Sequence, residues 1–337
     1  MTGADRHPCF NAAARSECAR IHLPVAPDCN ISCAYCDGKT DCVNESWPGV
    51  CSRVLEPEEA AELVDGAVLR MPALAVAGIA GPGDPLANPE PTLHTFELIR
   101  RRHPGLLFCL STNGVVLAGY AADLKSLGVG HVTVTVNAFS VSTAARIYRR
   151  LRINDSVIEG REAAERILEG QKKALAALRQ YGIATKVNTV VVPGVNDGEV
   201  EAIAEMAAGY GVSLMNCISF IPLPGTALEM AFPPDTELME SLRVRAGMHV
   251  PQMRHCARCR ADAFGLLRRT RDIRCSLTVR SPRQDRVSWL SLAQYSGSAD
   301  IQNKMKTETI VKPSGRVSIG VHEICAFKNP TIRSNSA

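Results

Sequence analysis

Apolar and polar positions alternate along the chain in a pattern that predicts strands and helices in regular succession. Short apolar runs rich in β-branched residues predict six strands, at Ile21–Pro27, Leu74–Gly81, Leu106–Thr112, His131–Asn137, Thr185–Pro193 and Ser213–Ser219. Apolar residues at helical spacing predict six helices, at Pro57–Leu69, Pro91–Arg101, Ala121–Leu127, Glu162–Tyr181, Asp197–Tyr210 and Thr236–Arg245. Each helix follows a strand, and strand–helix units in series predict a parallel sheet with right-handed crossovers.

The composition of the predicted strands indicates how this sheet is covered. Val187–Val192 is apolar almost throughout, which is typical of a strand that is buried on both faces of a parallel sheet. A full (β/α)8 barrel needs eight units and about 250 residues for the barrel alone. The chain offers only six units over Ile21–Ala246. We therefore expect an α/β fold, a curved and partly closed (β/α)6 barrel of the TIM-like kind.

Four regions follow from this pattern: residues 1–20 before the first strand, the barrel 21–249, a segment 250–275 with cysteines, and a tail 276–337. The tail shows a weak hairpin pattern at Thr309–Val311 and Val317–Val321. It holds nine of the 38 Lys and Arg and four of the 34 Asp and Glu. The chain's net charge of +4 therefore belongs to the tail, since residues 1–275 carry −1.

Composition excludes several classes of protein. The 46% hydrophobic and 21% charged residues of this 337-residue chain predict a folded core rather than a disordered chain. No apolar run reaches the roughly 18 residues that span a membrane, and the first residues lack the apolar region of a secretory signal. The charge is too weak to indicate a nucleic-acid partner. We expect a cytoplasmic protein that binds neither membranes nor nucleic acid.

The cysteines are the unusual feature of the composition. There are 13, an odd number in a chain without a secretory signal, which argues against a disulfide framework. Cys29, Cys33 and Cys36 form a C-x3-C-x2-C motif directly after the first predicted strand, where a barrel loop opens onto the catalytic face. Three thiolates can hold one iron–sulfur cubane and leave one iron open to a cofactor. Structural zinc, which normally takes four ligands, and unligated cysteines are the competing interpretations.

A second cysteine pair lies far along the chain. Cys256 and Cys259 form C-x2-C with His255 beside them, which by itself fits half of a zinc site or part of a cluster site. Arg254, Arg258 and Arg260 surround the pair and either neutralise an anionic cluster or form a solvated basic turn.

The first motif, with Tyr35 before its last cysteine, resembles the radical S-adenosylmethionine (SAM) superfamily. The turn after the second predicted strand resembles the glycine-rich turn that holds the methionine amino group of SAM in that superfamily, through Gly81, Gly83 and Asp84. Polar residues at the ends of later strands match positions that contact its ribose and carboxylate: Ser111, Thr112, Asn113, Asn137, Lys186 and Asn188. A plain turn and polar strand caps are the simpler alternatives.

A longer ordered set of motifs, from His7 to about Leu267, resembles the NifB family: His7–Phe10, His22–Pro27, Asp41–Ser46, Gly78–Pro89, Leu110–Gly114, Pro193–Asp197 and Met253–Ala263. The resemblance implies a maturase that builds NifB-co, the [8Fe-9S-C] precursor of the nitrogenase cofactor. It implies one SAM-binding [4Fe-4S] cluster and two further [4Fe-4S] clusters, which are fused with a carbide and an extra sulfide. One SAM gives a methyl group, and a second is cleaved to a radical that removes hydrogen from it.

The resemblance also implies a ligand set and partners. The further clusters need soft ligands, and the candidates are His7, Cys9, Cys42, Glu45, Cys109, Cys256 and Cys259. The expected partners are SAM, a ferredoxin or flavodoxin as electron donor, iron–sulfur assembly proteins as cluster source, and nitrogenase cofactor carrier or scaffold proteins as acceptor. Too few ligands to cap every iron would favour release of the product.

The chain departs from the family pattern in two places. Family members usually have paired histidines between Cys9 and His22, where this chain reads Ala14–Cys18, and Cys18 is the candidate substitute. The residues after the triplet also differ from the family's usual motif. Two other readings stay open: a radical SAM enzyme acting on an organic or peptide substrate, and a non-catalytic iron–sulfur carrier. A zinc-stabilised binding module is a more distant fourth.

Overall fold

The computed structural model describes residues 6–39, 41–44, 46, 49–267 and 271–272. All of them fall within one compact unit, Met1–Val279. Glu45 and the tail 276–337, with its predicted hairpin, lie outside the described residues.

The six predicted strands form one parallel sheet. They are β1 (Ala19–His22), β3 (Leu74–Ile79), β4 (Leu107–Thr112), β5 (Val129–Thr135), β8 (Ala184–Val191) and β9 (Leu214–Ser219), hydrogen-bonded in that order. The first strand is shorter than predicted, because Pro24 and Pro27 have no N–H to donate to a neighbouring strand. The chain still runs beside β3 after it, since Leu23 N–H donates to the Gly78 carbonyl at 2.9 Å.

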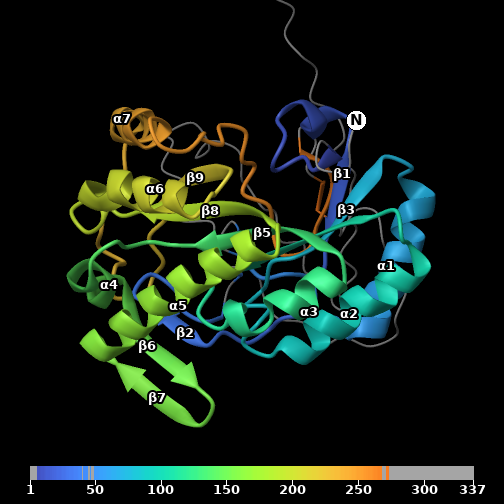
Figure 1. Ribbon diagram of the computed structural model, residues 1–337, viewed down its shortest axis with the longest axis horizontal. Coiled ribbons are helices and arrows are strands. Elements are labelled where there is room, and N and C mark those ends of the chain that lie inside the picture. The colour runs from blue at the N-terminus through green and yellow to red at the C-terminus, as the bar shows by residue number, and fades with distance from the viewer. Residues whose placement is uncertain (1–5, 40, 45, 47–48, 268–270, 273–337) are drawn as a thin grey trace, which may run out of the picture. The chain divides into compact units, whose positions relative to one another are not determined.

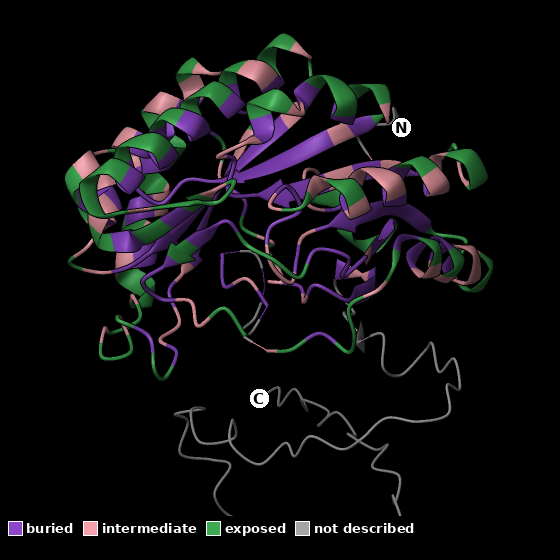
Figure 2. Cartoon of the chain, turned by 90° about the horizontal axis from the view of Figure 1, so that it is seen from below, coloured by how far each residue is buried: buried purple, intermediate pink, exposed green. Residues whose placement is uncertain are grey.

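Helices cover the outer, convex side of the sheet (Figures 1 and 2). The six predicted ones are α1 (Pro57–Arg70), α2 (Pro89–Arg102), α3 (Ala121–Ser126), α5 (Gly160–Gln180), α6 (Val200–Gly209) and α7 (Thr236–Gly247). Short 3-10 turns precede β1 (Ala13–Ser16), α3 (Leu117–Gly119) and α6 (Asp197–Glu199). Local signals fix the starts of the helices: Glu56 and Glu59 form a capping box before α1, and the Asp235 carboxylate accepts the Leu238 N–H at 2.7 Å. The predicted partial (β/α)6 barrel is confirmed.

The core lies between this sheet and these helices. Ile79, Val132, Val134 and Val187 on the strands are completely buried, as are Val64, Phe96 and Ile203 on α1, α2 and α6. Strands covered on one side by helices and on the other by the barrel interior have few positions that water can reach, which explains their apolar composition. None of the helices that the structure describes is long and apolar enough to cross a membrane.

Two additions to the barrel were not predicted. The strand β10 (Ala263–Leu266) pairs antiparallel with β1, and β11 (Arg271–Asp272) pairs with β10, so the sheet continues past its first strand. A separate three-stranded sheet consists of β2 (Ile31–Cys33), β6 (Tyr148–Ile153) and β7 (Ser156–Glu159), with α4 (Val141–Ile147) before β6. These strands are short, and in β6 only Tyr148 and Leu151 are buried, so their apolar pattern is too sparse to predict a strand.

The opposite edge of the sheet, β9, is covered by the chain after α7. Met215 exchanges backbone hydrogen bonds with Pro251 and Met253, at 2.9 and 2.7 Å. Further along β9, Arg243 donates to the Cys217 carbonyl at 3.1 Å and Arg258 to the Ser219 carbonyl at 2.7 Å. Residues 250–258 thereby occupy the open edge of the partial barrel, where an uncovered strand would present unpaired backbone groups.

Candidate active site

The loop after β1 and the strand β2 carry the first cysteine motif. Cys29 is exposed, Cys36 is half-buried and Cys33 is buried. Desolvation of the Cys29 thiol by the surrounding protein, with smaller contributions from the charges of Asp84 and Cys36, raises its pKa to about 12. Burial likewise raises the pKa of Cys33, as do the charges of Cys36 and Cys29. The charges of the three thiolates thus oppose one another, and bound cluster iron would offset that repulsion.

The glycine-rich turn after β3 lies against this loop. The Gly83 N–H donates to the Ala26 carbonyl at 2.7 Å, and the Asp84 N–H donates to the Asp28 carbonyl at 2.7 Å. A Cβ atom on Gly83 would stand only 2.1 Å from the Asp28 oxygen, so no residue with a side chain fits here. Gly81 has a φ of +137°, which also favours glycine. The structure thus brings the predicted SAM turn beside the cysteine triplet.

Asp84 joins the turn to the end of β4. Its carboxylate, only 4% exposed, accepts hydrogen bonds from the Thr112 hydroxyl at 2.9 Å and the Asn113 N–H at 2.6 Å. Burial raises its pKa, and these donors oppose that shift. The Asn113 side chain donates in turn to Asn30, the neighbour of Cys29, at 2.7 Å. Asp84, Thr112 and Asn113, all predicted to bind the cofactor, therefore contact one another. Together they hold the loop of Cys29 in place, in addition to any contact with a ligand.

Asn137 occupies the centre of a second buried network. Its side-chain amide donates to the Tyr35 hydroxyl and to Asn44 at 3.1 Å, while its carbonyl oxygen accepts the Val190 N–H at 2.8 Å. Tyr35 and Asn44, which precede and follow Cys36 in the sequence, are thus hydrogen-bonded to the residue that follows β5. Asn44 was not singled out from the sequence, because nothing in its neighbourhood indicates that its side chain turns inward.

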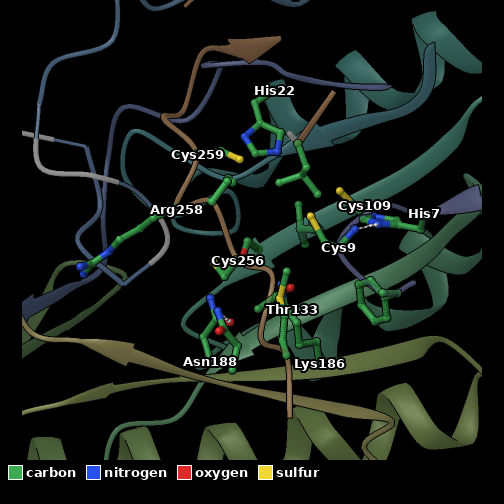
Figure 3. A pocket seen from close by; sticks show the side chains of 18 of the residues that line it. His7, Cys9, His22, Cys109, Thr133, Lys186, Asn188, Cys256, Arg258 and Cys259 are labelled. Atoms are coloured by element: carbon green, nitrogen blue, oxygen red, sulfur yellow. Dashed lines mark hydrogen bonds between the residues drawn. The ribbon is translucent and has the colours of Figure 1, made fainter. Parts of the chain in front are cut away.

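A second cavity, of about 60 Å³, gathers most of the remaining candidate ligands. Figure 3 shows His7, Cys9, Cys109, Cys256 and Cys259 around it, from three separate parts of the chain. Three further predicted residues also line it: Ser111, Lys186 and Asn188. Cys42 does not: its thiol accepts from the Asn44 amide at 3.5 Å, and its charge raises the pKa of Tyr35, so it lies on the side of the triplet.

Electrostatics confirm that these thiols are close neighbours. Burial raises the pKa of Cys9 to about 11, with smaller contributions from the charges of Cys259 and Cys256, whereas Lys186 and Arg20 lower it. Among the described residues, no group of three or more His, Cys, Asp or Glu side chains is arranged to hold a single metal ion.

The Cys109 side chain has room beside the cavity because the residue opposite it is a glycine. Gly78 on β3 is paired with Cys109 on β4, and a Cβ atom on Gly78 would stand 2.6 Å from the Cys109 sulfur. Cys18, the candidate substitute for the absent histidines, is buried instead with Ala14, Ala75 and Val76, and it does not line the cavity.

The cation that contacts the second cysteine pair is Arg20, which the sequence did not single out. Its guanidinium, on a residue only 1% exposed, donates to the Cys259 sulfur at 2.8 Å and to the Gly265 carbonyl at 2.5 Å. The arginines nearer in sequence have other partners: Arg254 pairs with Glu240 at 2.7 Å, and Arg260 pairs with Asp262 at 2.9 Å.

Two histidines line the cavity as neutral rings. Burial and the charge of Arg20 lower the pKa of His22 to about 4. Its Nδ1 lies 3.0 Å from the Arg260 carbonyl, so the neutral ring carries its proton there and Nε2 keeps a lone pair, as in many metal-binding histidines. His7 is the reverse: its Nδ1 accepts the Cys9 N–H at 3.1 Å, which places the proton on Nε2. His22 is thus the better-prepared ligand, although the sequence indicated only His7.

Comparison with known proteins identifies the fold family. Residues 23–207 match the model of the Radical SAM superfamily, a stretch that holds the triplet, the glycine-rich turn and the polar strand ends. The chain belongs to this superfamily. Membership implies a [4Fe-4S] cluster and SAM, and three features fit them: the C-x3-C-x2-C triplet, the turn beside it that only glycine allows, and the buried Ser111 hydroxyl in the cavity, which has no partner in the described chain.

Within the superfamily, this radical SAM protein is similar to proteins named FeMo cofactor biosynthesis protein NifB. It is 44% identical over 261 residues to the one from Chlorobaculum tepidum and 43% identical over 268 residues to the one from Klebsiella pneumoniae. The matches cover 77% and 78% of this chain but only 62% and 57% of those proteins. The resemblance to the NifB family is confirmed. Among solved structures, methylornithine synthase aligns over 69% of this chain and 71% of its own, with 15% identity and a TM-score of 0.44.

Proposed function

We propose that this radical SAM protein fuses two [4Fe-4S] clusters, with insertion of a SAM-derived carbide and an extra sulfide, to give the [8Fe-9S-C] precursor NifB-co. One observation carries the proposal: Cys9, Cys109, Cys256 and Cys259 line a cavity separate from the triplet. A radical SAM enzyme with an organic or peptide substrate would not need this second set of thiols. The similarity to the NifB proteins supports the same function.

The triplet and its surroundings would hold the cofactors. Cys29, Cys33 and Cys36 would bind the first cluster, and the turn at Gly81 and Gly83 would accept hydrogen bonds from the ammonium group of SAM. When bound, SAM supplies a methyl group and, after one-electron cleavage, the radical that abstracts hydrogen from it. Asp84 has its oxygens engaged by Thr112 and Asn113, so it would act by holding the turn in place.

The second cavity would hold the clusters that are substrates. Its thiols and neutral imidazoles are the soft ligands that iron–sulfur clusters take. Arg20 supplies a positive charge and a hydrogen bond to the Cys259 thiolate, which offsets the negative charge of a thiolate-ligated cluster. His22 joins the proposed ligands through its Nε2, whereas Cys42 lies nearer the triplet. A set this small leaves irons without protein ligands, so the product can leave.

The partners of the proposed reaction follow from its chemistry. It consumes SAM, and it consumes electrons that a ferredoxin or flavodoxin would deliver. It also needs iron–sulfur assembly proteins to supply clusters and a nitrogenase cofactor carrier or scaffold protein to receive the product. These partners are proposed from the family resemblance.

The test is a metal count on protein purified and reconstituted without oxygen. We expect about 12 irons per chain, with matching sulfide, as three four-iron clusters require. A Cys256→Ala/Cys259→Ala variant should lose irons from the cavity and keep the SAM-binding cluster. Cys217→Ala is the matched control, because this buried thiol contacts Gln252 and does not line the cavity. About four irons in all three proteins, or zinc in place of iron, would contradict the proposal.

A further inference from the structure

The small sheet of β2, β6 and β7 has one exposed face. Its other face packs into a hydrophobic cluster through Ile31, Tyr148 and Leu151. In Figure 1 the β6–β7 hairpin projects beyond the helices at one end of the molecule. Cross-strand pairing sets Arg150 opposite Ser32 on one side and opposite Glu159 on the other. The exposed face therefore extends over all three strands, from β7 across β6 to β2.

This face is a local concentration of positive charge. The β6–β7 hairpin, residues 148–159, holds three arginines, all on β6, and two acidic residues, whereas residues 1–275 as a whole carry −1. Arg150 pairs with Glu159 at 2.9 Å, and both side chains are exposed. Within the described part of the chain, neither Arg149 nor Arg152 forms an ion pair, and both are exposed. Unpaired exposed arginines on a rigid strand are suited to an acidic partner.

The same face lies next to the first cluster motif. The strand β2 contains Ser32 on the exposed side and Cys33 on the buried side, and the exposed Cys29 precedes it. The Arg152 N–H also donates to the Asn30 carbonyl at 2.7 Å, so the hairpin is fastened to the cysteine loop itself. A protein seated on the arginines would be separated from the triplet by the thickness of one strand.

We propose that this arginine face, Arg149, Arg150 and Arg152 with Ser32, is the docking surface for a small acidic one-electron carrier protein. The inference rests on the proposed function only in needing a cluster at the triplet. The transfer is a single-electron step: the reduced carrier loses one electron, the oxidised cluster gains it, and no bond forms or breaks. Complementary charge accelerates encounter and orients the carrier with its redox centre toward β2.

The experiment compares two reductants in a stopped-flow instrument. Reconstituted protein is mixed with a reduced acidic flavodoxin or with dithionite, and the loss of cluster absorbance is followed at several ionic strengths. The test variant is Arg149→Glu/Arg150→Glu/Arg152→Glu. The control is Arg70→Glu/Arg101→Glu/Lys125→Glu, which makes the same change of net charge at exposed positions of α1, α2 and α3.

We expect the test variant to react with flavodoxin about 10-fold more slowly or worse at low salt, with a flatter salt dependence, while dithionite reduces it at the wild-type rate. The control variant should stay within about twofold of wild type. Equal slowing in both variants, or no slowing in the test variant, would overturn the docking surface. If the triple variant is also reduced more slowly by dithionite, the single variant Arg152→Glu replaces it, and its rates with flavodoxin and with dithionite are compared in the same way.

Failure of the proposed function has a different signature. Protein that is reduced without cleaving SAM speaks against the chemistry and leaves the reduction rates to be judged by themselves, whereas protein that binds no iron at the triplet overturns both proposals. A test variant that accepts clusters from an assembly protein more slowly, but electrons at the normal rate, would assign the face to that other partner and overturn the inference.

Discussion

Arg20 offers the sharpest test of how the second cavity works. The substitution Arg20→Met keeps an unbranched side chain of similar length but removes the hydrogen bonds to Gly265 and Cys259. A buried carbonyl left without a donor costs about 1–3 kcal/mol, so the unloaded protein should lose roughly that much stability. A hydrogen bond from a charged donor contributes about 1.5–3 kcal/mol, so the Cys259 thiolate should hold its cluster roughly 10-fold to 100-fold less well.

Two measurements separate these effects. Urea unfolding of the unloaded protein gives the change in stability, and the rate at which a chelator strips iron from the loaded protein gives retention of the cluster. Arg243→Met is the control, because Arg243 also donates to a backbone carbonyl, that of Cys217 at 3.1 Å. We expect both variants to lose stability and only Arg20→Met to lose the cavity's iron faster. Equal stripping rates in the two variants would refute a specific role for Arg20.

Three further substitutions test other parts of the site. Gly83→Ala should abolish SAM binding, measured by calorimetry, because the added Cβ meets backbone at 2.1 Å; Gly105→Ala, which meets nothing within 4 Å, should not. Asn137→Ala should cost about 2–4 kcal/mol in urea unfolding, since several buried partners lose their bonds, and an unchanged midpoint would contradict this. Burial lowers the pKa of His131 to about 4 from 6.5. The unfolded chain therefore binds the extra proton first, and stability should fall as pH drops from about 6.5 to 4, by up to about 3 kcal/mol. His131→Gln should flatten this slope, and exposed His94→Gln should leave it intact.

The barrel was predictable because most of its strands are rich in apolar and β-branched residues and alternate with helices that have a clear apolar face. Such strands carry their own signal, as Val129–Thr135 and Ala184–Val191 do. The small sheet was not predictable, because β6 alternates arginines with only two buried residues. It is held by α5, which follows β7 directly, and by β2, which is remote in sequence, and no local pattern in β6 records the pairing with β2.

The candidate site divides in the same way. The triplet and the glycine-rich turn are local motifs, and the structure does bring them together. Arg20 was missed because a single arginine at the start of a strand normally faces water, and here it is buried where β10 lies against β1. His22 was missed because it lies near the start of a predicted strand, Ile21–Pro27, and was assigned to the barrel rather than to a ligand set.

The pairing of β10 with β1 has a consequence for the order in which the molecule is completed. Arg20 lies opposite Gly265, a separation of 245 residues along the chain. On the ribosome, the triplet loop and its turn are synthesised long before the segment that supplies Cys256 and Cys259. The first cluster site can therefore form on a nascent chain while the second cavity still lacks a wall. If the proposed function holds, the residues for the first cluster would thus be in place before the cavity for the substrate clusters is complete.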